Sequence, residues 1–109
     1  ELSPCTQKRD FIGVQDLCEA YFRLAKDLDR GGFDIFNVCS GEATELKTFI
    51  ELIADALNAD HQLLKFGKIR MRTGEPNIIV GDNSKASNVL SWIPRHLINA
   101  IQEDLNLIA

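Results

Sequence analysis

The sequence lacks the patterns that would direct a protein to a membrane or to nucleic acid. No apolar run approaches the roughly 20 residues that cross a bilayer, and residues 1–10 lack the apolar stretch of a signal peptide. Twelve basic and sixteen acidic residues leave a net charge of -4, and neither sign gathers into a block. We therefore expect neither a membrane nor a nucleic-acid partner.

The cysteines lack a recognisable pairing. Cys5, Cys18 and Cys39 cannot all pair within one chain, and their spacing matches neither a CxxC motif nor a zinc pattern with a histidine. We expect a reducing, cytoplasmic compartment and no metal site. Cys18 and Cys39 are interpreted as small apolar core residues of a helix and a strand, and Cys5 as a loop residue.

What the sequence does contain is the composition of one folded domain with alternating strands and helices. Hydrophobic residues make up 45% and charged residues 26% of the 109, and a chain of this length buries roughly two thirds of its unfolded surface. The periodicity predicts a strand at 9–14, a helix at 15–28, a strand at 34–40, a helix at 45–58, a strand or extended loop at 62–71, a strand at 78–80, a short helix reaching Trp92 and a last helix from Leu97.

Local signals fix several of these boundaries. Gly31-Gly32 is expected to stop the first helix, whose apolar positions are Leu17, Cys18, Tyr21, Leu24, Ala25 and Leu28. Thr44 is the predicted N-cap of the second helix, and Asp82 or Asn83 that of the third. The result is an α/β fold with a small mixed sheet and amphipathic helices. Two or three short strands would leave some apolar surface uncovered without a partner domain.

Four segments, in order, resemble the extended short-chain dehydrogenases that act on nucleotide sugars, the NAD-dependent epimerase/dehydratase family. They are residues 8–21, which begin Lys8-Arg9-Asp10-Phe11-Ile12; Phe36-Asn37-Val38-Cys39-Ser40-Gly41; Arg72-Thr73-Gly74-Glu75-Pro76; and Asp82-Asn83-Ser84-Lys85-Ala86 running into Leu90-Ser91-Trp92-Ile93-Pro94. Leu2-Ser3-Pro4 and Met71-Arg72 look most like the GDP-mannose dehydratase and reductase branch. The UDP-sugar epimerases and dTDP-glucose dehydratases share much of this pattern, so the nucleotide stays open.

The resemblance implies that residues 1–109 are the carboxy-terminal substrate-binding domain of an extended Rossmann-type enzyme, without its amino-terminal NAD(P)-binding domain. The family's Tyr-x-x-x-Lys pair is missing, because Ala25 stands four residues after Tyr21, and no GxGxxG loop occurs. The resemblance thus implies a homodimeric parent epimerase, dehydratase or reductase that uses NAD or NADP. This chain alone should bind no cofactor and catalyse nothing.

The same resemblance implies three substrate-binding residues. Arg9 and Arg72 match the arginines that hold the diphosphate, at a common pocket mouth, and Glu75 matches the acidic residue that accepts hydrogen bonds from the ribose. Without the resemblance, Arg9 would be an exposed strand-end residue, Arg72 a solvated base and Glu75 a turn residue. Lys8 and Arg70 would add only positive potential.

The remaining polar and aromatic candidates are interpreted as structural. Asp10, Asn83, Ser84 and Lys85 are explained by a helix cap and local hydrogen bonds. His61 and His96 have no acidic or nucleophilic companion in sequence, and neither is expected to be catalytic. Trp92 is predicted to plug the core between the last two helices.

A second hypothesis treats the chain as a free-standing, non-catalytic interaction module of the same fold, with its apolar stripes docking another protein. Gly13 favours it mildly, because the family usually carries Tyr, His or Asp there. The sequence does not decide the sugar, the reaction or NAD versus NADP.

Overall fold

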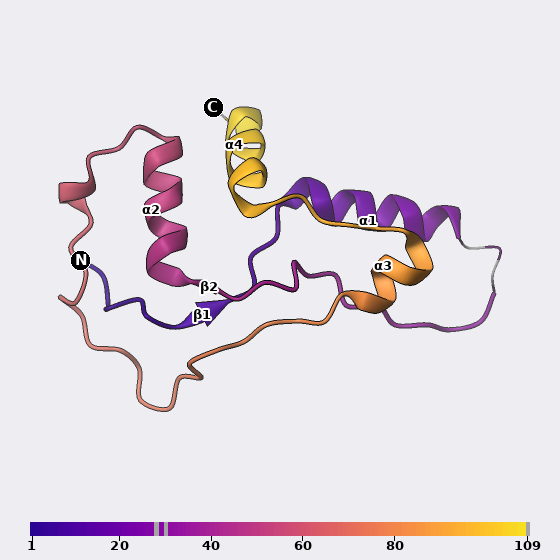
Figure 1. Cartoon of the computed structure of the whole chain (residues 1–109), viewed down its shortest axis with the longest axis horizontal. Coiled ribbons are helices and arrows are strands. Elements are labelled where there is room, and N and C mark those ends of the chain that lie inside the picture. Colours follow the sequence, from indigo (N-terminus) through magenta and orange to yellow (C-terminus); the bar gives the residue numbers. More distant parts are fainter. Residues whose placement is uncertain (28, 30, 109) are drawn as a thin grey trace.

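The computed structural model describes residues 1–27, 29 and 31–108. Its elements are β1 (Lys8–Arg9), α1 (Val14–Lys26), β2 (Thr44–Glu45), α2 (Leu46–Ala56), the 3-10 turn η2 (His61–Leu63), α3 (Ser84–Leu90) and α4 (Leu97–Ile108) (Figure 1). Helices and a small sheet alternate along the chain, so the predicted α/β class is confirmed.

The sheet is smaller than predicted and lies partly elsewhere. β1 pairs antiparallel with β2, with Lys8 opposite Glu45 and Arg9 opposite Thr44. An isolated parallel bridge also joins Lys8 to Ile78, outside the two-stranded sheet. The predicted strand at 9–14 shrinks to β1, residues 78–80 supply only that bridge, and residues 34–40 are irregular. A short apolar run reads as a strand, but it forms a ladder only where a partner strand lies beside it.

Helix boundaries agree more closely with the sequence. α1 begins one residue before the predicted start and ends at Lys26; the predicted end at Leu28 lies outside the described residues. α4 begins at the predicted residue, Leu97. Thr44 belongs to β2 instead of capping α2, which begins after Glu45 without a side-chain cap. α3 ends at Leu90, before Trp92, because Ser91 adopts a left-handed conformation with φ 52°.

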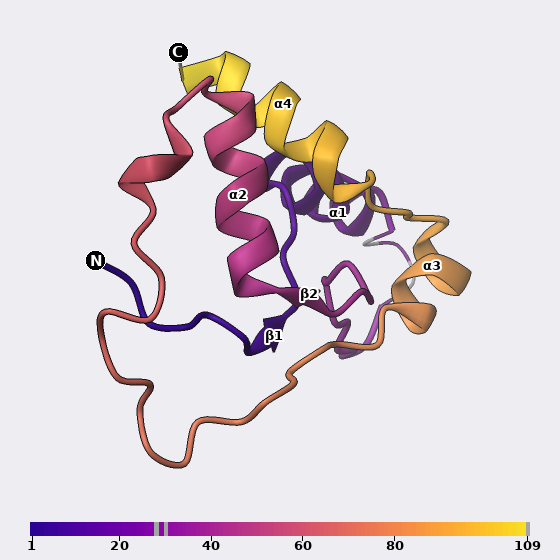
Figure 2. The ribbon, with the colours of Figure 1, turned by 60° about the vertical axis from the view of Figure 1, so that its left-hand side comes forward.

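A small core lies between α1 and α3. Trp92 is 1% exposed and packs with Ala20, Ala86 and Leu90, while its indole Nε1 donates to the carbonyl oxygen of Asp16 at 3.0 Å. Trp92 is therefore a core plug, as predicted, but it sits against α1 and α3 and not between the last two helices. The rings of Phe11 and Phe49 stack at 3.8 Å and attach the segment after β1 to α2. Figures 1 and 2 both show α2 beside α4.

The predicted apolar stripe of α1 was partly wrong. Asp16 and Ala20 are buried, with Leu17 and Leu24 half-buried, so these positions face the core. Cys18 is exposed and not a core residue, and Cys39 is half-buried in irregular chain and not in a strand; Cys5 is a loop residue, as predicted, and is buried. α1 has apolar residues on two faces, and the sequence pattern alone did not say which face the core covers.

The second face of α1 is open. Exposed apolar residues recur along it at helical spacing: Val14, Cys18, Tyr21, Phe22 and Ala25. We call this set the open α1 face.

The whole chain is thin for its mass. It measures 52 × 36 × 16 Å, and its radius of gyration of 16.7 Å exceeds the about 13 Å of a compact domain of this length. The accessible surface is 7691 Å², against about 6,100 Å² for a compact monomer of 12.2 kDa. The expectation of uncovered apolar surface is thus confirmed.

An ion-pair cluster on Arg95 joins α1 to α4. The guanidinium binds Asp16 through Nε and Nη2, Asp104 through Nη2 at 2.9 Å and Glu103 through Nη1 at 2.5 Å. The hydrogen bonds with Asp16, above all, raise the pKa of Arg95 beyond its ordinary value. A Cβ built on Gly13 would lie 2.7 Å from Asp16 and 2.8 Å from both Arg95 and Asp104. A side chain at position 13 would therefore have to push apart the ends of these three charged side chains.

Gly13→Ala is accordingly expected to lower the free energy of unfolding by about 1–3 kcal/mol, because the methyl group forces apart charged groups that hold one another. Urea denaturation followed by circular dichroism measures the change. Val14→Ala, one residue away on the open α1 face, serves as the control and should change stability by less than about 0.5 kcal/mol. Equal stabilities of Gly13→Ala and the unmodified chain would contradict this reading.

Candidate functional site

The carboxylate of Asp10 gathers three segments that have no regular structure. One oxygen, Oδ1, accepts from the amide and the hydroxyl of Ser40, both at 2.7 Å. The other, Oδ2, accepts from the amides of Gly41 at 3.0 Å and Gly81 at 3.1 Å. Burial raises the pKa of Asp10, but these hydrogen bonds, that of the Ser40 hydroxyl first, outweigh it and hold the pKa below its usual value. The structural role predicted for Asp10 is confirmed.

The neighbouring polar side chains also form hydrogen bonds with backbone groups. Asn83 donates from Nδ2 to the carbonyls of Cys39 at 2.9 Å and Ser40 at 3.1 Å. Asn83 holds the N-cap position of α3 without a capping side-chain hydrogen bond, whereas Asp82, one residue earlier, accepts from the amide of Ser84 at 2.9 Å. Lys85 pairs with Asp34, donates to the Ile35 carbonyl and lies over the Phe36 ring. These contacts hold residues 34–40 against the start of α3.

The first segment of the chain runs alongside residues 65–79. Leu2 exchanges backbone hydrogen bonds with Lys65, Lys68 and Ile69, and Lys8 with Asn77 and Ile79. Residues 70–76 form a loop between these two anchors, which reaches away from the helices in Figures 1 and 2. The predicted strand or extended loop at 62–71 contains no strand: it is η2 followed by irregular chain with a turn at 66–67 and bends at 68–69.

Arg9 and Glu75, two of the three predicted binding residues, meet at the end of this loop. The Arg9 guanidinium donates from Nη1 to the carbonyls of Lys8 at 2.7 Å and Pro76 at 3.0 Å. Its Nη2 binds Oε1 of Glu75 at 2.7 Å. The two side chains are only 21% and 25% exposed. The fold therefore brings together a base and an acid that lie 66 residues apart in the sequence.

Arg72 lies on the same loop but joins neither of them. Its side chain is exposed, and within the described chain it has no hydrogen bond or ion pair. The better-formed cavities of the described residues do not include Arg9, Arg72 or Glu75 in their lining. In this chain the three predicted residues therefore do not line any of these cavities. Arg72 precedes Glu75 by three residues on the 70–76 loop, and we call Arg9, Arg72 and Glu75 together the loop-edge site.

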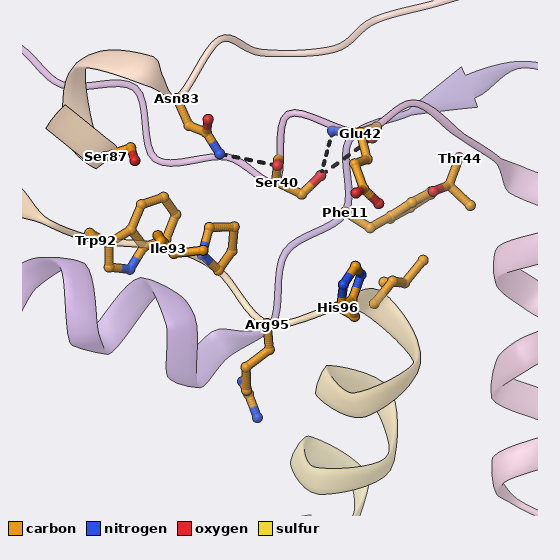
Figure 3. A pocket seen from close by; sticks show the side chains of 12 residues that line it. Phe11, Ser40, Glu42, Thr44, Asn83, Ser87, Trp92, Ile93, Arg95 and His96 are labelled. Atoms are coloured by element: carbon orange, nitrogen blue, oxygen red, sulfur yellow. Dashed lines mark hydrogen bonds between the residues drawn. The ribbon is translucent and has the colours of Figure 1, made fainter.

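A separate cavity of about 280 Å³ lies between α3, α4 and the segment after β1 (Figure 3). Ser40, Asn83, Trp92 and Arg95 line it, but their polar groups are already bound within the chain. Ser87, on α3, and His96, in the segment just before α4, stand on opposite sides of it in Figure 3. No nucleophile and base are paired there, so this cavity has no arrangement for catalysis.

His61 has an acidic companion that the sequence reading missed. Its Nε2 lies 2.7 Å from Oδ1 of Asp55, six residues earlier at the end of α2. Both side chains are about half exposed or more, so the pair is a surface contact. The end of α2 and the turn at η2 fold Asp55 back beside His61, a geometry that spacing alone does not reveal.

Searches for metal and membrane features add two observations. Among residues 1–27, 29 and 31–108, no group of three or more His, Cys, Asp or Glu side chains is placed to hold a metal ion. In the same part of the chain, no helix has the length and apolarity that crossing a bilayer requires.

No family model matches the chain. It is 31% identical over 94 residues to the GDP-6-deoxy-D-mannose reductase of Pseudomonas aeruginosa, covering 86% of this chain and 30% of that protein. It is equally identical to a UDP-glucose 4-epimerase of Rhizobium leguminosarum, covering 85% of this chain and 28% of the relative. The chain belongs to the short-chain dehydrogenase family of nucleotide-sugar epimerases and reductases. The resemblance inferred from the four sequence segments is thus confirmed.

The fold comparison agrees with this assignment. A crystal structure of a UDP-glucose 4-epimerase superposes with a TM-score of 0.77 at 30% identity, over 93% of this chain and 31% of that one. The structure of RMD from Pseudomonas aeruginosa complexed with NADPH gives 0.68 at 27% identity, over 98% and 35%. The chain spans about 30% of the length of the curated relatives that it matches.

Asp10→Asn is expected to lower the free energy of unfolding by about 1–3 kcal/mol, because an amide nitrogen would face amide donors that now bind an oxygen. The pH dependence has a defined sign. Since the folded-state pKa is lowered, the contribution of Asp10 is complete above the unfolded-state pKa of about 3.9 and is lost as the pH falls from there through the folded-state pKa.

Urea denaturation at several pH values checks this expectation. Stability should fall less steeply with acidification in Asp10→Asn than in the unmodified chain, whereas Asp29→Asn, at an exposed position, should leave the slope unchanged. Parallel acid profiles for Asp10→Asn and the unmodified chain would rule out the role assigned to Asp10.

Proposed function

We propose that the chain is the carboxy-terminal, substrate-binding portion of an NAD(P)-dependent nucleotide-sugar epimerase, dehydratase or reductase, and that the loop-edge site holds the nucleoside diphosphate. The observation that carries this proposal is that the Arg9 guanidinium is held in place and keeps unused hydrogen-bond donors. The Arg9 side chain is only 21% exposed, and its guanidinium is held by two backbone carbonyls that use only part of its donors.

A count of donors shows what Arg9 still offers. A guanidinium has five N–H groups, and in Arg9 two go to carbonyls and one to Glu75. The Nε–H and one Nη2–H have no partner in the described chain. Two donors on adjacent nitrogens suit the parallel hydrogen bonds that a phosphate group accepts, each worth about 1.5–3 kcal/mol.

Arg72 and Glu75 would complete the site. Arg72 is exposed on the 70–76 loop, where it can add a second positive group without breaking a contact. Glu75 lies beside Arg9 and would accept hydrogen bonds from the ribose hydroxyls. Gly74, with φ 78°, sets the turn that presents this carboxylate.

The uncovered apolar surface supports a missing cofactor domain. The accessible surface exceeds that of a compact monomer by about 1,600 Å², roughly twice the area that one partner buries in a standard protein interface. In this proposal the open α1 face docks on the chain's own NAD(P)-binding domain. That domain would bring the cofactor, which supplies hydride transfer, while this portion holds the sugar nucleotide and by itself catalyses nothing.

Further parts of the proposal follow from the family. The parent would be a cytoplasmic homodimer, and the nucleotide could carry guanine or uracil, since a GDP-sugar reductase and a UDP-sugar epimerase are equally similar. The alternative is a free-standing interaction module whose open α1 face binds another protein. A reading frame upstream of Glu1 that encodes a Gly-rich phosphate loop and Tyr-x-x-x-Lys favours the enzyme. A start codon beside Glu1 favours the module.

Arg9→Ala is expected to weaken binding of GDP or UDP by about 10- to 150-fold, the loss of one charge-assisted contact. Arg72→Ala should weaken it in the same direction. Isothermal titration measures both, with circular dichroism to show that each variant is folded. Lys26→Ala, which removes the same charge at the far end of α1, should bind like the unmodified chain. Equal affinities for the Arg9 and Lys26 variants would contradict the proposed site.

A further inference from the structure

We propose that Glu75 is an internal counter-ion: its carboxylate occupies Arg9 in the free chain and is displaced when a diphosphate binds. This inference rests on the proposed function of the loop-edge site and adds a selection step to it. The displaced carboxylate needs new donors, so the site should favour a ligand that brings hydroxyl groups over a bare phosphate.

The contacts of Arg9 show that Glu75 is not needed to orient it. The two carbonyls of Lys8 and Pro76 hold Nη1, and both belong to backbone that the bridge between Lys8 and Ile78 fixes. Glu75 binds the other terminal nitrogen, Nη2. A phosphate that takes two parallel hydrogen bonds from one guanidinium edge needs Nε and Nη2 together. Glu75 already takes one hydrogen of Nη2, so a phosphate on this edge would share that nitrogen with the carboxylate.

Glu75 has little else to hold it there. Its ion pair with Arg9 is its only hydrogen bond or ion pair in the described chain. It follows Thr73 and Gly74, which are both exposed, and no side chain packs where a Cβ on Gly74 would lie. Release of the carboxylate therefore breaks one contact and disturbs no core packing.

The negative charge of Glu75 affects which ligands can bind beside Arg9. A carboxylate and a pyrophosphate are both negative, and beside one guanidinium they repel each other. When inorganic pyrophosphate binds, either the carboxylate stays beside Arg9 and the two anions repel each other, or the carboxylate leaves and loses its hydrogen-bond donor. A nucleoside diphosphate can bind the released carboxylate through its ribose hydroxyls and recover the lost contact. Glu75 thus selects against free phosphates, which share the charged part of the substrate.

The test compares inorganic pyrophosphate with UDP and GDP by isothermal titration of the full chain and of Glu75→Gln. Removal of the charge should strengthen pyrophosphate binding by about 2- to 5-fold, the range of a partly exposed ion pair. The same change should weaken or leave unchanged the binding of the nucleoside diphosphate. The preference for the nucleoside diphosphate over pyrophosphate should therefore fall.

Two controls sharpen the comparison. Glu75→Asp keeps the charge and should keep pyrophosphate binding as weak as in the unmodified chain. Glu42→Gln removes an exposed carboxylate outside the loop-edge site and should change neither affinity. Circular dichroism confirms that the variants are folded.

The outcomes separate this inference from the proposed function. If Glu75→Gln weakens or does not change pyrophosphate binding while the unmodified chain still binds nucleoside diphosphates, Glu75 is no counter-ion and only this inference fails. If folded chains with and without the substitution bind neither ligand, the proposed function fails as well.

Discussion

One carboxylate determines how this chain is assembled. Asp10 binds Ser40, Gly41 and Gly81, and these residues lie in segments without strand or helix. A ladder of backbone hydrogen bonds would normally hold such segments, and here side-chain contacts replace it. Because Asp10 directly follows Arg9, the same contacts place the end of β1, and with it the guanidinium, against the 70–76 loop.

The thinness of the chain limits how much apolar packing can hold its helices together. With one small core around Trp92, most of the long apolar residues are only half-buried or exposed. The Arg95 cluster and the stacked rings of Phe11 and Phe49 join α1, α2 and α4 where apolar packing is sparse. This thinness is the reason for proposing that the chain is a portion of a larger fold; the relatives that it matches are about three times as long.

How far the sequence predicted the structure depends on whether each signal is local. α2 and α4 were foreseen because their apolar stripes need only one chain segment to be recognised. The strands were misplaced because pairing requires a partner distant in sequence, as Lys8 with Ile78 shows. Cys18 was assigned to the wrong face because α1 carries apolar residues on both sides.

For the candidate binding residues, too, the long-range contact was the part that the sequence did not predict. The family resemblance indicated Arg9, Arg72 and Glu75, yet no local pattern indicated that Arg9 and Glu75 would bind each other across 66 residues. Whether the Arg9 guanidinium receives a phosphate is tested directly by nuclear magnetic resonance of the arginine Nε–H groups during titration with UDP or GDP. We expect a saturating shift of the Arg9 signal. No shift, or a larger one at Arg23 or Arg95, would contradict the proposed role of Arg9.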